Sequence, residues 1–348
     1  MDALIHHLER KEELSPREIT VAAELLLDSN APDEKKVALL ENLSRKGETP
    51  AEIAGFVEAF LEHAVDPHVG LLDLEGPTID VCGTGGDKLN LFNVSTTAMF
   101  VVAATGAVVM KHGNRGITSK SGGADVLESL GIRIDLQADG FRDCLEKAGV
   151  GFLFAPNYHP AFKAVANARK QLAEKGVRTI FNLIGPLMNP AKPQCQLVGV
   201  FDREMCPAFA EILQRLGRES AWAVHGTTGD GRCVDEVSLM GSTRICKAGL
   251  YQDLQDEEIR PRDFGMKHAE VDELQGGDAE VNAAILEAIL SGKETGPKRD
   301  MVVLNAGAAI ACCGLSDDIG DGIEIARRLI DDGSALDRLR LLQDVAKR

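Results

Sequence analysis

Aromatic residues and positive charge are both scarce in this chain of 348 residues. Phe, Trp and Tyr make up 4% of it, so a platform of rings that stacks nucleic-acid bases is not expected. Lys and Arg total 38 against 54 Asp and Glu, which gives a formal net charge of −16. That balance argues against a broad basic surface for nucleic acid. It leaves room for a small anionic substrate, which needs only a few local cations.

Long apolar runs and closely paired cysteines are also missing. No run approaches the roughly 18 apolar residues that span a bilayer. Residues 1–20 are rich in charge and lack the apolar region of a secretory signal. The eight cysteines form no C-x-x-C pair, which disfavours a zinc site. We therefore expect a cytoplasmic protein with reduced thiols and no membrane association.

Helical signals dominate residues 1–72. Ser15-Pro16-Arg17-Glu18 combines an N-cap, a first-turn Pro and a capping-box Glu, and an apolar stripe follows it. Thr49-Pro50-Ala51-Glu52 starts a later helix in the same way along the chain. At roughly 150 residues per domain the length predicts about two domains. Residues 1–72 are therefore expected to form a small helical domain.

From residue 73 onward, short apolar strands alternate with helices. Strands are expected at 78–82, 107–110, 196–201, 221–224 and 238–239, and helices at about 95–105, 124–130, 205–216, 281–290, 301–312 and 320–331. This alternation predicts an α/β domain over 73–348 with Gly-rich loops at the carboxyl ends of strands. Residues 259–280 are polar and carry no clear motif.

A Gly-rich turn follows the first strand, in the sequence D-V-C-G-T-G-G-D of residues 80–87. Closely spaced glycines let several backbone N–H groups converge on an oxyanion. The helix opened by residues 93–96 (N-V-S-T) adds N-cap oxygens and free N–H groups. The pattern predicts a phosphate loop, with an ordinary tight turn as the alternative. It is not a dinucleotide fingerprint, because the third Gly would fall at Lys88, and it is not a Walker A loop.

A second polar segment follows the strand at 107–110. Residues 111–121 hold three cations and three hydroxyls together with His112 and Asn114: Lys111, Arg115, Lys120, Thr118, Ser119 and Ser121. Cations and hydroxyls together can bind phosphate oxygens. We interpret residues 111–121 as a second anion-binding loop, and an ordinary solvated loop is the alternative.

Two weaker motifs follow. Asp235-Glu236 stands between two valines and could hold Mg²⁺ through one or two oxygens, although such pairs are more often surface charge. Arg169 and Arg178 each carry a planar fork that suits a carboxylate, although either one alone is more often a surface or ion-paired residue.

In this order, the motifs G-T-G-G-D, N-x-S-T, K-H-G-N-R…S-K-S-G and R-T-I-F-N…G-P-L…N-P resemble the anthranilate phosphoribosyltransferase family of tryptophan biosynthesis. The resemblance extends to Asn305-Ala306-Gly307. It implies transfer of the phosphoribosyl group from phosphoribosyl pyrophosphate (PRPP) to the amine of anthranilate, giving N-(5-phosphoribosyl)anthranilate and pyrophosphate. The implied fold is of the nucleoside phosphorylase and phosphoribosyltransferase type. It has a small helical domain that receives a later excursion at about 165–190, and a larger α/β domain with a mixed central sheet. A homodimer through the helical domain is also implied.

The same resemblance assigns the site. The residues implied to bind PRPP are Gly83, Gly86, Asp87, Asn93, Val94, Ser95, Thr96, Lys111, His112, Gly113, Asn114, Arg115 and Ser119. Those implied to contact Mg²⁺, the expected cofactor, are Ser95, Asp235 and Glu236. Anthranilate would contact Gly83, Asn114 and Arg169, with Arg169 facing its carboxylate. Lys111 and Arg169 would carry the catalytic roles.

The sequence departs from the family pattern in a few places. Leu91 stands where Thr is usual, Gly116 and Gly123 stand where Ser is common, and the loop at 227–233 is lengthened. Two alternatives therefore stay open. One is a transferase or phosphorylase of the same fold with another acceptor. The other is a catalytically silent relative that binds nucleic acid, which the net charge and the retained Asp235-Glu236 pair disfavour.

Overall fold

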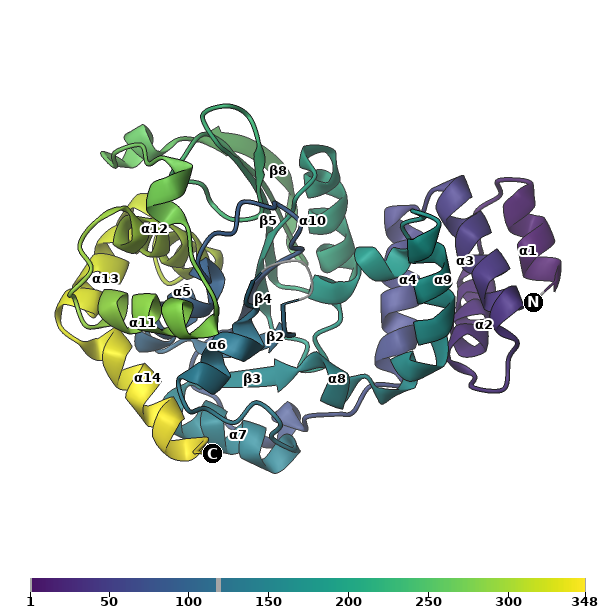
Figure 1. Cartoon of the computed structure of the whole chain (residues 1–348), viewed down its shortest axis with the longest axis horizontal. Helices are drawn as coiled ribbons and strands as arrows, with labels where there is room; N and C mark the ends of the chain where they lie inside the picture. The colour runs from purple at the N-terminus through teal and green to yellow at the C-terminus, as the bar shows by residue number, and fades with distance from the viewer. Residues whose placement is uncertain (1, 117–119, 348) are drawn as a thin grey trace. The chain divides into compact units, whose positions relative to one another are not determined.

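The computed structural model describes residues 2–116 and 120–347 (Figure 1). The chain divides into two compact units, residues 1–66 with 156–190 and residues 67–155 with 191–348. The sequence-based bounds, 1–72 and about 165–190, differ from these divisions by six residues at the first boundary and by about nine at the second, and agree at residue 190. The first unit is helical and the second is α/β with a mixed sheet, which confirms the expected fold class. No helix among the described residues is long and apolar enough to cross a membrane.

Helices from two stretches of sequence build the helical unit. The first stretch contributes α1 (Asp2–Glu9), α2 (Pro16–Leu27), α3 (Asp33–Lys46) and α4 (Pro50–Leu61). The second contributes α8 (Ala155–Tyr158), α9 (Ala166–Glu174) and the short 3-10 turns Pro160–Val165, Ile180–Asn182 and Gly185–Leu187. Ser15 and Thr49 form complete capping boxes with Glu18 and Glu52, so both expected helix starts are confirmed.

A buried lysine ties the two stretches together. Lys36 on α3 has no exposed surface, and its Nζ donates to Asp28 O at 2.7 Å and to Ala164 O at 2.6 Å. Asp28 ends α2, and Ala164 lies in the 3-10 turn before α9. Because one ammonium group holds both carbonyls, the returning segment is fixed to the N-terminal helices.

The strands of the α/β unit, within the described ranges, form one sheet of eight. They are β1 (Thr78–Gly83), β2 (Val108–Gly113), β3 (Val150–Phe154), β4 (Cys195–Gly199), β5 (Ser220–Thr227), β6 (Cys233–Val234), β7 (Thr243–Gly249) and β8 (Gln252–Ile259). Their order is β3-β2-β1-β4-β5-β7-β8, with β6 paired to β5. The first five strands in this order run parallel, and β6, β7 and β8 join antiparallel.

Helices cover both faces of this sheet. They are α5 (Val94–Ala104), α6 (Gly123–Ser129), α7 (Ala138–Ala148), α10 (Cys206–Arg215), α11 (Ala279–Leu290), α12 (Pro297–Cys312), α13 (Ile319–Asp331) and α14 (Ser334–Val345). Short 3-10 turns occupy Val69–Leu71, Arg203–Met205, Pro261–Phe264 and Val271–Leu274. Figure 1 shows α12 and α10 on opposite sides of β5. The main hydrophobic core lies between the sheet and α5, α12 and α14, with Ile79 and Val81 of β1 fully enclosed.

Several element predictions need correction. The strand expected at 238–239 is wrong: Ser238 N–H donates to Thr243 Oγ1 at 2.8 Å, so a side chain takes the place of a strand partner. β2 extends through Gly113, so Lys111 and His112 belong to the strand and not to the loop after it. The structure adds β3, β6, β7, β8, α7 and α14, which the sequence pattern did not predict.

The strand order places a topological switch point at β1. From β1 the chain moves outward through β2 and β3, and then returns to place β4 on the other side of β1. In open α/β sheets, ligands bind beyond the carboxyl ends of strands at such a point. The Gly-rich turn at residues 83–87 begins at this position.

Replacing Lys36 should loosen the helical unit. We expect Lys36→Ala to lower the free energy of unfolding by about 1–3 kcal/mol, because two backbone carbonyls lose a charged donor. The matched control is Lys35→Ala, which removes an exposed ion pair to Asp2 and should cost under about 1 kcal/mol. Urea unfolding followed by circular dichroism measures both. Equal stability of the two variants would contradict the role of Lys36.

Candidate active site

Four chain segments meet at the carboxyl end of the parallel strands in the α/β unit. They are the Gly-rich turn after β1, the first turn of α5, the end of β2 and the Asp235-Glu236 pair after β6. The predicted PRPP residues Gly83, Gly86, Asp87, Asn93, Val94, Ser95, Thr96, Lys111, His112, Gly113, Asn114 and Arg115 all lie on the first three segments. Ser119 lies outside the described residues.

The Gly-rich turn is shaped to receive the acid pair. Gly85 and Gly86 adopt φ values of +71° and +101°, which favour glycine. Gly85 N–H donates to Asp235 Oδ2 at 2.6 Å. A Cβ added to Gly199 on β4 would lie 1.6 Å from the Asp235 carbonyl oxygen, and one added to Gly83 would lie 2.5 Å from Asp235 Oδ2. The glycines at 83 and 199 therefore make room for this loop.

Three carboxylates are close enough to perturb one another. Asp235 hydrogen-bonds to Asp87, and Glu236 Oε1 accepts from Ser95 N–H at 3.3 Å. Loss of hydration, together with the charge of Asp87, raises the pKa of Asp235 to about 7. Loss of hydration, together with the charge of Asp235, raises the pKa of Glu236 to about 8. Burial also raises the pKa of Asp87. Ionising all three acids is therefore unfavourable unless a further positive charge is present.

Lys111 is the cation at the centre of the site. Its side chain is buried at the end of β2, and its Nζ donates to Val81 O and, at 3.2 Å, to Ser95 Oγ. Its charge acts against the rise in the pKa of Glu236. The ammonium group is therefore held in place before any substrate binds.

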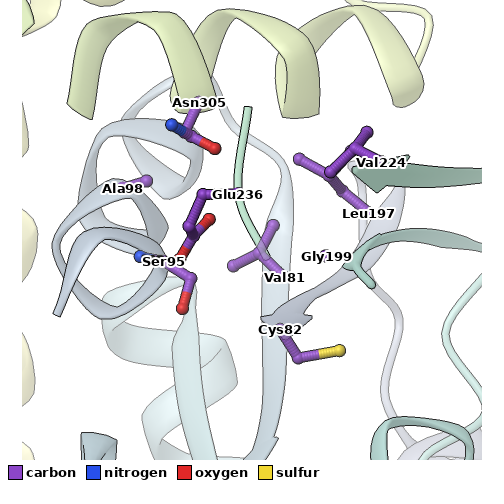
Figure 2. Close-up of a pocket in the computed structure, with 9 residues that line it drawn as sticks. All are labelled: Val81, Cys82, Ser95, Ala98, Leu197, Gly199, Val224, Glu236 and Asn305. Carbon is purple, nitrogen blue, oxygen red and sulfur yellow. Dashed lines mark hydrogen bonds between the residues drawn. The ribbon is translucent and has the colours of Figure 1, made fainter. Parts of the chain in front are cut away.

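A small pocket lies beside Ser95 and Glu236 (Figure 2). Figure 2 shows Ser95, Glu236 and Asn305 on one side, with Leu197 and Val224 across from them. The remaining lining residues are Val81, Cys82, Ala98 and Gly199.

Asn305 from α12 holds the acid loop by its backbone. Its Oδ1 accepts from Val237 N–H at 2.9 Å, and its Nδ2 donates to Val237 O at 2.8 Å and to Met301 O at 2.9 Å. Val237 follows Glu236 directly, so the Asn305 amide fixes the position of the backbone next to Glu236. Sequence reasoning noted Asn305 only as part of a motif. A polar residue inside an otherwise apolar helix was the available signal.

The donor set fits a hard divalent cation. No three His, Cys, Asp or Glu side chains form a metal-binding group within residues 2–116 and 120–347. Mg²⁺ needs fewer, because it usually takes one or two carboxylates and completes its shell with water and substrate phosphates. Asp235, Glu236 and the Ser95 hydroxyl supply oxygen ligands, and the raised pKa values of the two acids, caused first by burial, show that their charged forms are unfavourable here without a compensating cation.

The loop after β2 is organised by α6. Asp125 Oδ2 accepts from Gly116 N–H at 2.8 Å and from Gly122 N–H at 2.9 Å. Arg115 pairs with Asp125 and Glu128, so its guanidinium is held by acids of its own neighbourhood. Asp125 stands three residues after the helix N-cap Gly122, and this spacing is the sequence signal of its role.

Packing against α5 explains why position 123 is a glycine. A Cβ at this position would lie 2.9 Å from Thr96 Oγ1, closer than ordinary contacts allow. The Ser that the family pattern favours would therefore push on the first turn of α5.

Arg169 lies on α9 in the helical unit. Its guanidinium stacks over the Phe181 ring at 5.0 Å, and burial lowers the pKa of Arg169. Phe181 stacks on Phe60 and meets Phe162 edge to face, with ring centroids 5.3 Å apart in both pairs. A partly buried guanidinium over an aromatic cluster suits a flat aromatic acid.

Comparisons with known proteins agree with this geometry. Residues 2–64 match the glycosyl transferase family helical bundle domain, and residues 75–336 match its a/b domain. An anthranilate phosphoribosyltransferase of Herpetosiphon aurantiacus is 42% identical over 340 residues, covering 97% of this chain and 96% of that one. One from Haloferax volcanii is 43% identical over 300 residues, covering 86% of each chain.

Solved structures agree as well. The crystal structure of anthranilate phosphoribosyltransferase from Thermus thermophilus has a TM-score of 0.87 at 37% identity, covering 98% of this chain and 99% of that one. The Saccharomyces cerevisiae enzyme in complex with PRPP and Mg has a TM-score of 0.85 at 26% identity, covering 99% and 98%.

The two matched parts define the class: a glycosyl transferase that joins a helical bundle to an α/β domain. The two relatives identify one family within that class. Each alignment covers most of the relative and most of this chain. The chain belongs to the anthranilate phosphoribosyltransferase family, which confirms the resemblance seen in the motifs.

Filling the space at Gly199 should destabilise the α/β unit. We expect Gly199→Ala to lower the free energy of unfolding by about 1–3 kcal/mol, because its Cβ overlaps the Asp235 carbonyl. Gly70→Ala is the control, since a Cβ there meets nothing within 4 Å, and it should stay within about 0.5 kcal/mol. Urea unfolding checks both. Gly199→Ala as stable as Gly70→Ala would show that the acid loop does not lie against β4.

Proposed function

We propose that this protein transfers the phosphoribosyl group of PRPP to the amine of anthranilate, giving N-(5-phosphoribosyl)anthranilate and pyrophosphate. One observation carries the proposal: a Gly-rich turn, a helix N-terminus, a buried lysine and a pair of acids converge beyond one end of the sheet. Relatives that bear this activity in their names, over nearly the whole chain, support it.

The donor half of the site suits a polyanion. Gly85 N–H donates to Asp235 and Ser95 N–H donates to Glu236, so the Gly-rich turn and the N-terminus of α5 border the same acid pair. Helix N-termini are frequent phosphate sites. Asp235, Glu236 and the Ser95 hydroxyl would hold Mg²⁺ with the substrate. When bound, the cation would neutralise charge on the pyrophosphate as it leaves.

The chemistry needs no strong base. The nucleophile is an aniline-type nitrogen, which is unprotonated at neutral pH. Its lone pair forms the bond to C1 of the ribose as the C1–O bond to pyrophosphate breaks, and the amine proton passes to water. The protein therefore acts by positioning and by stabilising charge on the leaving group. Lys111, already fixed by Val81 and Ser95, would donate to that group.

In the helical unit, the residue that would bind the acceptor is Arg169. The guanidinium over Phe181 offers a planar fork for the carboxylate, and the neighbouring rings offer an apolar surface. Mg²⁺ as cofactor, a homodimer through the helical domain and a cytoplasmic location complete the proposal. Their support is the family resemblance, and for Mg²⁺ also the acid pair.

The first test is loss of anthranilate fluorescence when the protein is mixed with PRPP and Mg²⁺. We expect the fluorescence to fall with Mg²⁺ and to persist when EDTA is added, because the acids and the pyrophosphate both need a compensating cation.

A calorimetric titration with Mg²⁺ and PRPP accompanies the assay. PRPP binding without fluorescence loss would sink the assigned acceptor and leave the donor site standing. Absence of both would contradict the whole proposal.

A second test addresses the acceptor alone. We expect Arg169→Ala to raise KM for anthranilate roughly 10- to 100-fold, because about 1.5–3 kcal/mol of charge-assisted hydrogen bonding is lost. KM for PRPP should change little. The control is Lys170→Ala at the exposed neighbouring position, and its KM values for anthranilate and PRPP should match those of the parent protein. Equal rises in both KM values would mean that Arg169 supports the structure instead.

A further inference from the structure

Residues 259–280 are polar and carry no clear motif, and the end of this stretch pairs with the segment that precedes α5. Leu91 and Gln275 form an antiparallel β-bridge. On either side of it, Phe92 N–H donates to Leu274 O at 3.2 Å and Gly276 N–H donates to Asn90 O at 2.9 Å. The strap, residues 274–277, thus runs alongside the segment that leads into Asn93.

A buried amide at the start of α11 continues this contact. Asn282 is 3% exposed, and its Nδ2 donates to Asn93 Oδ1 at 2.8 Å. Its Oδ1 accepts from Gly277 N–H at 2.8 Å, which closes the strap onto the helix. Asn93 Nδ2 in turn donates to Ser121 O at 3.3 Å. Two side-chain amides in series therefore join α11, the start of α5 and the loop after β2.

This relay changes what Asn93 does. By position Asn93 is the N-cap of α5, yet its side chain makes no capping bond, which corrects the role expected from the sequence. An Asn at an N-cap normally satisfies one of the first N–H groups itself. Here its amide is engaged by Asn282 and Ser121 instead. In the first turn of α5, Val94 N–H donates to Phe92 O at 2.8 Å and Ser95 N–H donates to Glu236 Oε1 at 3.3 Å, and the Asn93 side chain caps none of these N–H groups.

We propose that Asn282 is a positioning residue for the PRPP site. It holds the Asn93 side chain away from the helix end, so that this amide does not compete with a phosphate for the first N–H groups of α5. This inference rests on the proposed function, because it assigns the phosphate to PRPP. The space around the relay is tight: a Cβ on Gly276 would lie 2.4 Å from Asn282 Oδ1 and 2.7 Å from Phe92 Cα.

The test is Asn282→Asp, which keeps the acceptor for Gly277 N–H and replaces the donor to Asn93 with an oxygen. Titration calorimetry with Mg²⁺ and PRPP should show a Kd about tenfold higher, the effect of one lost hydrogen bond near 1.4 kcal/mol. KM for anthranilate should stay within about twofold. Such a split is not expected from general destabilisation.

The matched control is Asp278→Ala. Asp278 caps the same helix through Val281 N–H at 3.0 Å and takes no part in the relay. It should lower thermal stability and leave the Kd for PRPP within about twofold, because loss of a cap acts on the helix alone. An Asn282→Asp protein that binds PRPP like this control would overturn the proposal.

A second readout separates this inference from the proposed function. Hydrogen exchange of the amides at residues 94–97 should change in Asn282→Asp, or in Asn282→Ser if the first variant does not fold, and should not change in Asp278→Ala. Unchanged exchange would overturn the relay even where PRPP binds. A parent protein that fails to bind PRPP, but shows the exchange difference, would overturn the proposed function and keep the relay.

Discussion

Negative charge gathered at one end of the sheet is the constraint on which the site depends. Asp235 and Glu236 are adjacent in sequence, and Asp87 reaches the same place from the Gly-rich turn. Packing like charges together is unfavourable unless donors or cations compensate them. The chain supplies Gly85 N–H, Ser95 N–H and the charge of Lys111, and the pKa values of both acids are still raised. In the proposed function a phosphate would approach the same N–H groups. The acids and the phosphate would then need a cation between them, which is the physical basis for expecting Mg²⁺ with the substrate.

The donor half was predictable because its signals are local. A short apolar strand followed by clustered glycines, and a polar segment after the next strand, each point to the carboxyl end of a strand, and parallel neighbours bring those ends together. The position of Asp235 could not be derived in this way. It lies 150 residues from Gly85, and only the long pairing of β4 and β5 beside β1 brings them into contact. Family resemblance supplied the assignment that local pattern could not.

Among the strands that were missed, β8 has a clear cause. β8 carries the sequence Q-D-L-Q-D-E-E-I at the edge of the sheet and is largely exposed, so it lacks the apolar alternation that reveals a strand. The error at 238–239 is the reverse case. Ser238 and Leu239 are buried and read as a strand, but Ser238 N–H and Oγ bond to Thr243 Oγ1 and Thr227 O. Burial pattern alone does not say which group satisfies the backbone.

Two buried side-chain amides fix the geometry of this site, and no sequence motif predicts that role. Asn305 fixes the backbone after Glu236 from α12, and Asn282 fixes Asn93 from α11. Both are buried, and both lie on helices that come late in the chain. A buried amide is costly unless its donors and acceptors are all used, and so it specifies one arrangement of the backbone it binds. Helices late in the sequence thus determine the geometry of loops that come earlier in the sequence. Leu91 belongs to the same arrangement: its partly buried side chain packs on the core, and its backbone pairs with Gln275. Where the family pattern has Thr, this chain therefore has an apolar side chain that packs on the core just before Asn93.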